Sequence, residues 1–306
     1  MKVATVGVHV LDTHVIGIES IPDRSEGQLV STIRMSPAGT AGGTAVVLSR
    51  LGAEVSSYGA VGTDPIGDTL LALLGAEGVD TSGLVRKGDQ QTSASVIPVR
   101  PNGDRPAWHC IGANGAFTLE DLPPLDGFDF VHLGGPEFLG GEAAGRLLAR
   151  AREAGATTSL DLLAPGDPDM LAWIADALPH ADYLLPNDEQ VLGFTGAASL
   201  EDGARALLAR GVGCVAVTQG AKGALVVTAD DVVEVPAYDV ELVDTTGCGD
   251  AFSAGFLRGL SLGADVREAA RLGCATAAQV AQGLGTDAGS YTLESVRAFE
   301  ESASAR

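Results

Sequence analysis

The stretch from Val243 to Phe256 reads VDTTGCGDAFSAGF and places a run of small residues directly before one carboxylate, Asp250. The segments 232–235 and 240–243 before it are rich in valine, so the order strand, small-residue turn, helix is predicted. The first N–H groups of a helix lack partners within it and lie at the positive end of its dipole, so anions are favoured there. Its glycines, having no Cβ, let a ligand approach the backbone. The stretch therefore predicts an anion site with a proton acceptor, Asp250, beside it.

This stretch resembles the C-terminal signature of the ribokinase, or pfkB-type, family of carbohydrate kinases. The resemblance implies that Asp250 is the catalytic base and that the amides of three residues form an anion hole for the γ-phosphate of ATP, namely Gly247, Cys248 and Gly249. Cys248 stands where the family usually has alanine or another small residue. Because a thiol at a helix N-terminus can have a lowered pKa, we hypothesise that Cys248 is reactive. On the residues alone, a glycine-rich turn before a buried helix is the alternative.

Short apolar runs alternate with helical patterns over most of the chain, which predicts a mostly parallel sheet between layers of helices. The predicted strands are 3–8, 55–61, 130–133, 157–162, 183–186 and 215–218, and the predicted helices are 42–51, 65–75, 142–154, 169–177 and 200–210. Two inserted segments, approximately 13–35 and 91–111, are β-branched, rich in turn residues and without helical periodicity, so they predict a small separate sheet. The resemblance implies a ribokinase-like three-layer αβα sandwich in a single domain, 1–306. It also implies that the inserted strands form a lid over the sugar and a surface for a homodimer.

The N-terminal half supplies candidate residues for the phosphoryl acceptor. Asp12 follows the first predicted strand, where a carboxylate can accept hydrogen bonds from two sugar hydroxyls. The run 37–45 is similar to the family's first glycine-rich signature, which implies sugar contacts from Gly39, Thr40, Gly42 and Gly43. Gly43 stands where the family usually has asparagine, and Ala38 replaces one glycine of its pair. The alternatives are tight packing of helix on sheet for the glycines and a turn-forming role for Asp12.

Two further segments resemble elements that bind the nucleotide. The run VTQGAKGA at 217–224 resembles the family's T-x-G-x-x-G segment, which implies ATP contacts from Thr218, Gly220 and Gly223. The run PNDEQ at 186–190 resembles the family's N-x-x-E element, which implies a role for Asn187 at the nucleotide. A β-hairpin and a capped helix start are the respective alternatives.

Candidate ligands for metal ions follow from the same resemblance. Gln190 stands where the N-x-x-E element has glutamate, and Mg²⁺ prefers carboxylate oxygen, so either Glu189 serves instead or the Mg²⁺ shell differs. Asp161, at the end of a predicted strand, is a second candidate for hydrated Mg²⁺ or a cap for residues 165–166. The family often binds a monovalent cation such as K⁺ behind the anion hole, which implies Asp244 and Thr246, with Gly285 and Ser290 as further candidates.

The bulk composition limits the class of protein. The 306 residues carry 19 Lys plus Arg against 40 Asp plus Glu, a net charge of −21, which argues against nucleic-acid and anionic-membrane partners. No apolar stretch approaches the roughly 20 residues that span a bilayer. Four scattered cysteines without a C-x-x-C pair predict a reducing compartment, and we expect the cytoplasm.

Other functions compete with the kinase interpretation. The run 259–263 is a literal G-x-S-x-G, but it follows a predicted helix rather than a strand, and no histidine follows His180, so a hydrolase using Ser261 is disfavoured. The chain has no P-loop G-x-x-x-x-G-K-[ST]. A nucleoside kinase of the same fold and a non-catalytic sensor stay open. We expect an ATP- and Mg²⁺-dependent kinase acting on a hydroxyl, expected to be primary, of a small sugar.

Overall fold

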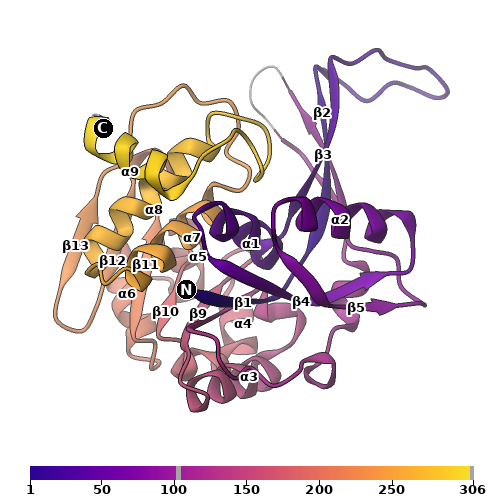
Figure 1. Cartoon of the computed structure of the whole chain (residues 1–306). Helices are drawn as coiled ribbons and strands as arrows, with labels where there is room; N and C mark the ends of the chain where they lie inside the picture. The colour runs from indigo at the N-terminus through magenta and orange to yellow at the C-terminus, as the bar shows by residue number, and fades with distance from the viewer. Residues whose placement is uncertain (101–104, 304–306) are drawn as a thin grey trace.

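A computed structural model of the chain describes residues 1–100 and 105–303. Within these residues the main sheet has nine strands in the order β13-β12-β11-β10-β9-β8-β1-β4-β5 (Figure 1). Its neighbours are parallel except for the pairs β11–β12 and β12–β13 at one edge, which are antiparallel. The strands are β1 (Lys2–Gly7), β4 (Glu54–Gly62), β5 (Asp80–Lys87), β8 (Phe130–Gly134), β9 (Thr157–Asp161), β10 (Tyr183–Leu184), β11 (Cys214–Thr218), β12 (Ala224–Val227) and β13 (Val232–Val235).

Helices cover both faces of this sheet (Figure 1). One side holds α1 (Thr40–Arg50), α2 (Pro65–Ala76), α7 (Cys248–Ser261), α8 (Val266–Val280) and α9 (Leu293–Ser302), and the other holds α3 (Gly141–Glu153), α4 (Pro168–Trp173), α5 (Asp188–Thr195) and α6 (Leu200–Leu208). Successive residues of one strand pack in the hydrophobic cores on opposite sides of the sheet. In β1, Val3 packs on the side of α1 and α7, and Ala4 packs on the side of α3. Strands buried on both faces must be apolar almost throughout, which explains their valine- and alanine-rich sequences. The predicted αβα sandwich is confirmed.

The lid is a separate four-stranded sheet that projects from the main body (Figure 1). Its strands, in the order β3-β2-β6-β7, are β3 (Thr32–Ala38), β2 (Val10–Ile16), β6 (Ala94–Val99) and β7 (Trp108–Cys110). β2 pairs with β3 antiparallel and with β6 parallel, and β6 pairs with β7 antiparallel. The predicted small sheet is confirmed, but its strands extend beyond 13–35 to Val10 and Ala38, and residues 17–31 form no strand. Part of the second segment, 101–104, lies outside the described residues.

Two local predictions differ from the structure, and one strand was missed. Residues 240–243 form no strand, because Val243 donates its N–H to the Ala281 carbonyl (2.8 Å), beyond the end of α8, and not to a neighbouring strand. The helix predicted at 169–177 is divided into α4 and a 3₁₀ segment at Ala175–His180 that contains Pro179. β5 could not be predicted, because only one of its residues is buried and its sequence, DTSGLVRK, contains few apolar residues.

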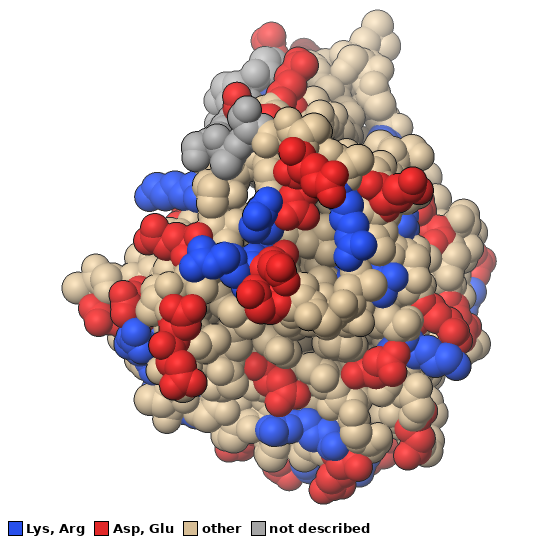
Figure 2. All heavy atoms as spheres, turned by 60° about the vertical axis from the view of Figure 1, so that its left-hand side comes forward, with Lys and Arg blue, Asp and Glu red and all other residues tan. Residues whose placement is uncertain are grey.

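Charged side chains of both signs are interspersed over the face shown in Figure 2. None of the helices in the described ranges is long and apolar enough to span a lipid bilayer. The four cysteines are all unpaired.

Candidate active site

α7 begins at a tight turn formed by residues 245–248. The Thr245 carbonyl accepts the Cys248 N–H at 3.2 Å. Gly247 has φ 78° and ψ 0°, the values that the third position of a type II turn requires and that residues with a Cβ rarely adopt. A Cβ at Gly247 would also lie 2.4 Å from Thr286 Oγ1. The turn that presents the start of α7 therefore depends on glycine for both conformation and space.

Three N–H groups at this turn have no hydrogen-bond acceptor among the described residues: those of Gly247, Gly249 and Asp250. The space beside Gly249 is open, since a Cβ there would meet no atom within 4 Å. The amide of Cys248, predicted to be a free donor, is instead used inside the turn. Unpaired N–H groups at the start of a 14-residue helix favour an anion, so this turn is a candidate anion site beside Asp250.

The carboxylate of Asp250 packs against α1 at Gly43. A Cβ built on Gly43 would lie 2.2 Å from Asp250 Oδ2 and 3.0 Å from Thr286 Cγ2. Gly43, which has no Cβ, thus leaves the space that this carboxylate occupies. The structure brings together Gly43 and Asp250, which the sequence analysis had assigned separately to the acceptor site and to the base.

The environment of Asp250 favours its protonated form. Burial raises the pKa of Asp250 well above the ordinary value, and the nearby carboxylates of Asp161 and Asp12 raise it further. Asp161 itself is buried and accepts hydrogen bonds from the Ser253 hydroxyl (3.0 Å) and the Leu162 N–H (2.7 Å). Burial raises the pKa of Asp161 to about 7. A raised pKa makes Asp250 a stronger proton acceptor, which suits a general base acting near neutral pH.

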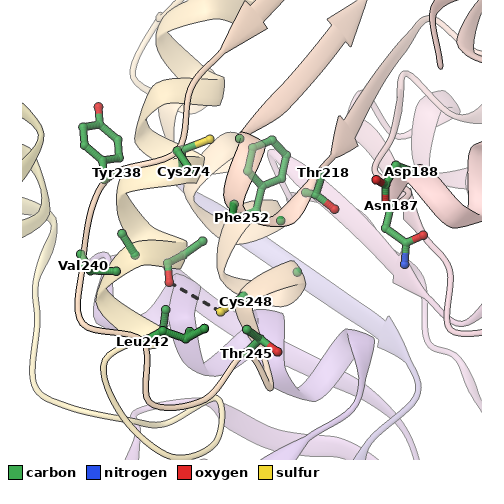
Figure 3. A pocket seen from close by; sticks show the side chains of 18 of the residues that line it. Asn187, Asp188, Thr218, Tyr238, Val240, Leu242, Thr245, Cys248, Phe252 and Cys274 are labelled. Atoms are coloured by element: carbon green, nitrogen blue, oxygen red, sulfur yellow. Dashed lines mark hydrogen bonds between the residues drawn. The ribbon is translucent and has the colours of Figure 1, made fainter. Parts of the chain in front are cut away.

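A cavity of about 660 Å³ lies beside the start of α7 (Figure 3). It is lined by all four residues predicted to contact ATP, namely Asn187, Thr218, Gly220 and Gly223. Cys248 and Gly249 of α7 border the same cavity, and Tyr238, Val240 and Leu242 form its wall on the side away from Asn187 (Figure 3). The volume falls in the range of small-molecule sites, and an apolar wall facing a polar one suits a nucleotide base with its phosphates.

The polar side of this cavity is built where the end of β11 lies beside the start of α5. Asn187 and Thr218 form a parallel bridge, and the Thr218 N–H donates to the Pro186 carbonyl at 2.9 Å. The Asn187 side chain caps α5 by accepting the Gln190 N–H (2.8 Å), so the predicted capped helix start is present as well. Gly223, at φ 100°, turns the chain from β11 into β12, and a Cβ there would lie 2.0 Å from the Val235 carbonyl oxygen.

The side-chain amide of Gln190 is used in hydrogen bonds to the backbone that hold the local fold. Its side-chain oxygen accepts the Asn187 N–H (2.9 Å), and its side-chain nitrogen donates to the carbonyls of Leu162 (3.0 Å) and Ala164 (2.8 Å). Glu189 is exposed and borders the cavity. Of the two residues that the sequence left open for the Mg²⁺ shell, only Glu189 offers a carboxylate to the cavity. Among the described residues the Asp161 carboxylate accepts hydrogen bonds from Leu162 and Ser253 and none from residues 165–166, so the predicted cap is not formed.

The lid presents a row of polar side chains, the inner row, formed by Ser36, Asp12, Ser95 and His109. These residues lie directly opposite one another on β3, β2, β6 and β7, so their side chains share one face of the sheet. His109 Nδ1 lies 2.8 Å from Ser95 Oγ. Asp12 is buried within β2 rather than in a loop, which corrects its predicted turn-forming alternative. Burial raises the pKa of Asp12, while Ser95, His14 and His109 partly oppose that rise.

Several buried polar atoms near α1 and β2 have no hydrogen-bond partner among the described residues. They include His9 Nε2, His14 Nδ1, Thr40 Oγ1, Thr44 Oγ1 and Thr286 Oγ1. Because buried polar groups are normally hydrogen-bonded, such a concentration marks a place where ligand hydroxyls or water can bind. Of the predicted sugar contacts, Thr40 belongs to this group. Gly39 and Gly42 fit the packing alternative, since Cβ atoms there would meet Val8 O at 2.5 Å and His9 Cδ2 at 3.1 Å.

Asp244 is buried behind the α7 turn and is hydrogen-bonded on both oxygens. Oδ1 accepts the N–H and the hydroxyl of Thr246, each at 3.0 Å, and Oδ2 accepts the Gly285 N–H at 3.1 Å. The Arg105 guanidinium, from the connection between β6 and β7, contacts both Asp244 and Thr246, the pair predicted to hold a monovalent cation. Ser290 is exposed. Arg105 could not be predicted from the sequence, because no motif surrounds it.

The hypothesis that Cys248 is a reactive thiolate is contradicted. Burial, with a smaller effect from Asp244, raises the pKa of Cys248 to about 12. Its Sγ turns from the free amides toward α8 and lies 3.7 Å from the Ala277 carbonyl oxygen (Figure 3). A thiol in this setting stays protonated and is a poor nucleophile at neutral pH.

We therefore expect iodoacetamide at pH 7.5 to leave Cys248 unmodified and to alkylate the exposed Cys110. Intact-mass analysis with peptide mapping measures both sites. In the Cys110→Ser variant the reagent should leave turnover unchanged. If iodoacetamide inactivates that variant and ATP protects it, Cys248 is a reactive thiol after all.

Ser261 is the last residue of α7, and its hydroxyl donates to the Arg258 carbonyl at 2.7 Å. A hydrolase would need this serine on a strand-to-helix turn. The G-x-S-x-G run is therefore a helix end, as the sequence predicted.

The chain is similar to known proteins over most of its length. Residues 2–293 match the profile of the pfkB family carbohydrate kinase. A fructokinase of Vibrio alginolyticus is 29% identical over 239 residues, which cover 75% of this chain and 78% of that protein. A nucleoside kinase of Methanothermobacter thermautotrophicus is 28% identical over 286 residues, which cover 91% and 89%.

Among solved structures, an E. coli protein described as a ribokinase II, in complex with ATP and Mg²⁺, superposes with a TM-score of 0.85. The alignment covers 98% of this chain and 99% of that one at 23% identity, a likeness that shows the fold. Together with the match over residues 2–293, these relatives settle the family. The chain belongs to the pfkB family of carbohydrate kinases, and it is a phosphotransferase.

Proposed function

We propose that the protein transfers the γ-phosphate of ATP to a hydroxyl, expected to be primary, of a small sugar or sugar derivative. One observation carries the proposal: Asp250, with a raised pKa, stands next to unpaired amides that border a cavity of nucleotide size. A base, an anion site and a nucleotide pocket in contact are the parts that phosphoryl transfer to an alcohol needs.

In this proposal Asp250 accepts the proton of the acceptor hydroxyl as that oxygen attacks the γ-phosphorus. The N–H groups of Gly247, Gly249 and Asp250 stabilise the negative charge on the transferred group. These donors are fixed by the turn at 245–248, so little reorganisation is required during the reaction. Asn187 and Thr218 hold the nucleotide on the other side of the cavity.

Mg²⁺ fits the residues present as an ion held mainly by phosphate oxygens and water, and when bound it neutralises charge on the outer phosphates. In the described ranges no three His, Cys, Asp or Glu side chains form a cluster that could hold a metal by itself. Glu189 is the exposed carboxylate on the cavity and would contact the hydrated ion. The E. coli protein of the same fold was solved with ATP and Mg²⁺, which supports these two cofactors for the fold. A monovalent cation at Asp244 and Thr246 stays a prediction.

The acceptor is proposed to lie between Asp250 and the inner row. Asp12, with its neighbours Ser36 and Ser95, supplies hydrogen-bonding groups suited to several hydroxyls on one molecule. A sugar, which carries a hydroxyl on most of its carbon atoms, satisfies such groups better than the flat aromatic base of a nucleoside does. A nucleoside is the second candidate, favoured by the nucleoside kinase that aligns with 91% of the chain.

The experiment that tests the function measures ADP release with hexoses, pentoses, their derivatives and nucleosides at equal concentration. We expect acceptor-dependent ADP release and a phosphorylated product with at least one sugar. A sugar or nucleoside that binds tightly without ADP release would instead support a non-catalytic sensor. ADP release with nucleosides alone would select the second candidate.

We further propose that the chain acts as one domain and forms a homodimer through the outer face of the lid. Opposite the inner row lies the outer row, formed by Met35, Thr13, Val96 and Trp108. Its three apolar members are 50%, 43% and 54% exposed, respectively, and Ile33 beside them is 67% exposed. Such a contiguous apolar sheet face is typical of an interface, and a second copy of the lid offers a matching surface.

Replacing Val96 with glutamate should therefore convert a dimer to a monomer, because a charge would be buried in the interface. Light scattering coupled to size exclusion measures the mass, which is expected to fall from twice 31.0 kDa to 31.0 kDa. Leu192→Glu, at a 37%-exposed site on α5, is the control that should stay dimeric. A wild-type protein that is monomeric at high micromolar concentration would overturn the lid dimer.

A further inference from the structure

One positively charged side chain of the lid contacts the turn at the start of α7. Arg105 lies in the connection between β6 and β7, and its guanidinium contacts the carboxylate of Asp244 and the hydroxyls of Thr245 and Thr246. Asp244 is buried, while the Arg105 side chain is 29% exposed. These three partners directly precede Gly247, the first residue of the proposed anion site. The contact therefore joins two segments that are about 140 residues apart in the sequence.

Asp244 does not need this cation to satisfy its hydrogen bonds. Its two oxygens already accept three protein donors, from Thr246 and Gly285. Asp244 is thus a buried carboxylate whose oxygens are fixed in place and can orient a guanidinium, whose five donors exceed the three contacts made here.

The position of Arg105 in the cavity suggests what the guanidinium meets. Arg105 lines the cavity together with Gly249, whose amide is unpaired, and with Thr245. Of the described residues that line this cavity, Arg105 alone is a lysine or arginine, whereas Asp188 and Glu189 are acidic. Charge on a transferring phosphoryl group is stabilised by a cation, and an arginine can supply it within the same chain. A chain with a net charge of −21 has to provide that cation locally.

We propose that Arg105 is a catalytic residue that contacts the transferred phosphoryl group, and that Asp244 is the positioning residue that holds its guanidinium beside α7. The inference rests on the proposed kinase reaction. In that step the bond from the γ-phosphorus to the bridging oxygen of ADP breaks, and the bond to the acceptor oxygen forms. The acceptor proton passes to Asp250, and Arg105 transfers no proton in this step. Its lid position means that the charge comes from the same sheet that holds the acceptor.

The first test measures binding rather than turnover. ADP and ADP with aluminium fluoride and Mg²⁺, a mimic of the transferring phosphoryl group, are titrated by calorimetry into wild type, Arg105→Ala, Arg105→Lys and Arg146→Ala. Arg105→Ala should lose about 10²-fold in affinity for the mimic and change little for ADP, as expected for loss of a donor to developing charge. Arg146, exposed on α3 and absent from the cavity, is the matched control. Equal losses for both ligands, or none, would overturn the proposal.

The second test separates a catalytic role from a structural one. Arg105→Ala should lower kcat by about 10²–10³-fold with the KM of the acceptor within about threefold, and free guanidinium should restore part of the rate. Its thermal midpoint should fall only slightly, because Asp244 loses one ion pair but keeps its hydrogen bonds to Thr246 and Gly285. Arg105→Lys should retain part of kcat. A strongly lowered midpoint with no guanidinium rescue would identify a purely structural ion pair. If wild type releases no ADP with any acceptor, the kinase proposal itself fails, and the binding test still decides the role of Arg105.

Discussion

Replacing Asp250 with asparagine is expected to lower kcat by about 10²–10⁴-fold while the fold stays intact, because the variant cannot accept the proton of the acceptor hydroxyl. The side chains are nearly the same size, so packing against Gly43 is retained. ADP release under saturating substrates measures the effect. Asp202→Asn, at an exposed position on α6, is the control that should keep the wild-type rate. Near-normal turnover by the Asp250 variant would refute its assignment as the base.

The raised pKa of Asp250 gives this substitution a second signature. In wild type, kcat/KM should fall as pH drops through the raised pKa, so its acidic limb should lie above the ordinary carboxyl range. Because the fold favours the protonated acid, the stability that it contributes is present below the unfolded pKa of about 4 and is lost as pH rises through the folded pKa. The asparagine variant escapes this loss. Its thermal midpoint should equal that of wild type near pH 4 and exceed it at pH 8.

Replacing Asp12 with asparagine is expected to lower kcat/KM for the acceptor by about 10²–10³-fold and to leave the KM of ATP nearly unchanged. The buried carboxylate can accept hydrogen bonds from two sugar hydroxyls. The asparagine amide is neutral, and its NH₂ group is a donor, so it cannot accept the second of these bonds. Initial rates with each substrate varied in turn measure the split. Thr13→Ala, one residue away on the opposite face of β2, is the matched control. An equal rise in both KM values would place Asp12 outside the acceptor site.

Much of the architecture could be predicted because it follows from local periodicity. Val3 and Ala4 serve two different cores, and that requirement alone makes buried parallel strands recognisable. The turn before Asp250 could be read from its glycines, since only they adopt the backbone of Gly247. The predictions failed where the outcome depended on distant contacts: residues 240–243 look like a strand, yet Val243 bonds to Ala281 after α8.

The residues missed at the site share one property. Ser95 and His109 reach Asp12 through the register of the lid sheet, and Arg105 reaches Asp244 across about 140 residues, so no local pattern marks them. The reverse error occurred at Cys248, where position at a helix start suggested a low pKa but burial raises it. Gln190 shows the same limit, because its similarity to a metal-site motif conceals a role in capping and loop anchoring.

A crystal structure with a non-hydrolysable ATP analogue, Mg²⁺ and an acceptor identified by ADP release tests the proposed reaction most directly. We expect the terminal phosphoryl group within about 3 Å of the Gly249 and Asp250 N–H groups, and an acceptor hydroxyl within hydrogen-bonding distance of the Asp250 carboxylate. Phosphates bound away from the start of α7, or an acceptor hydroxyl out of reach of Asp250, would contradict it.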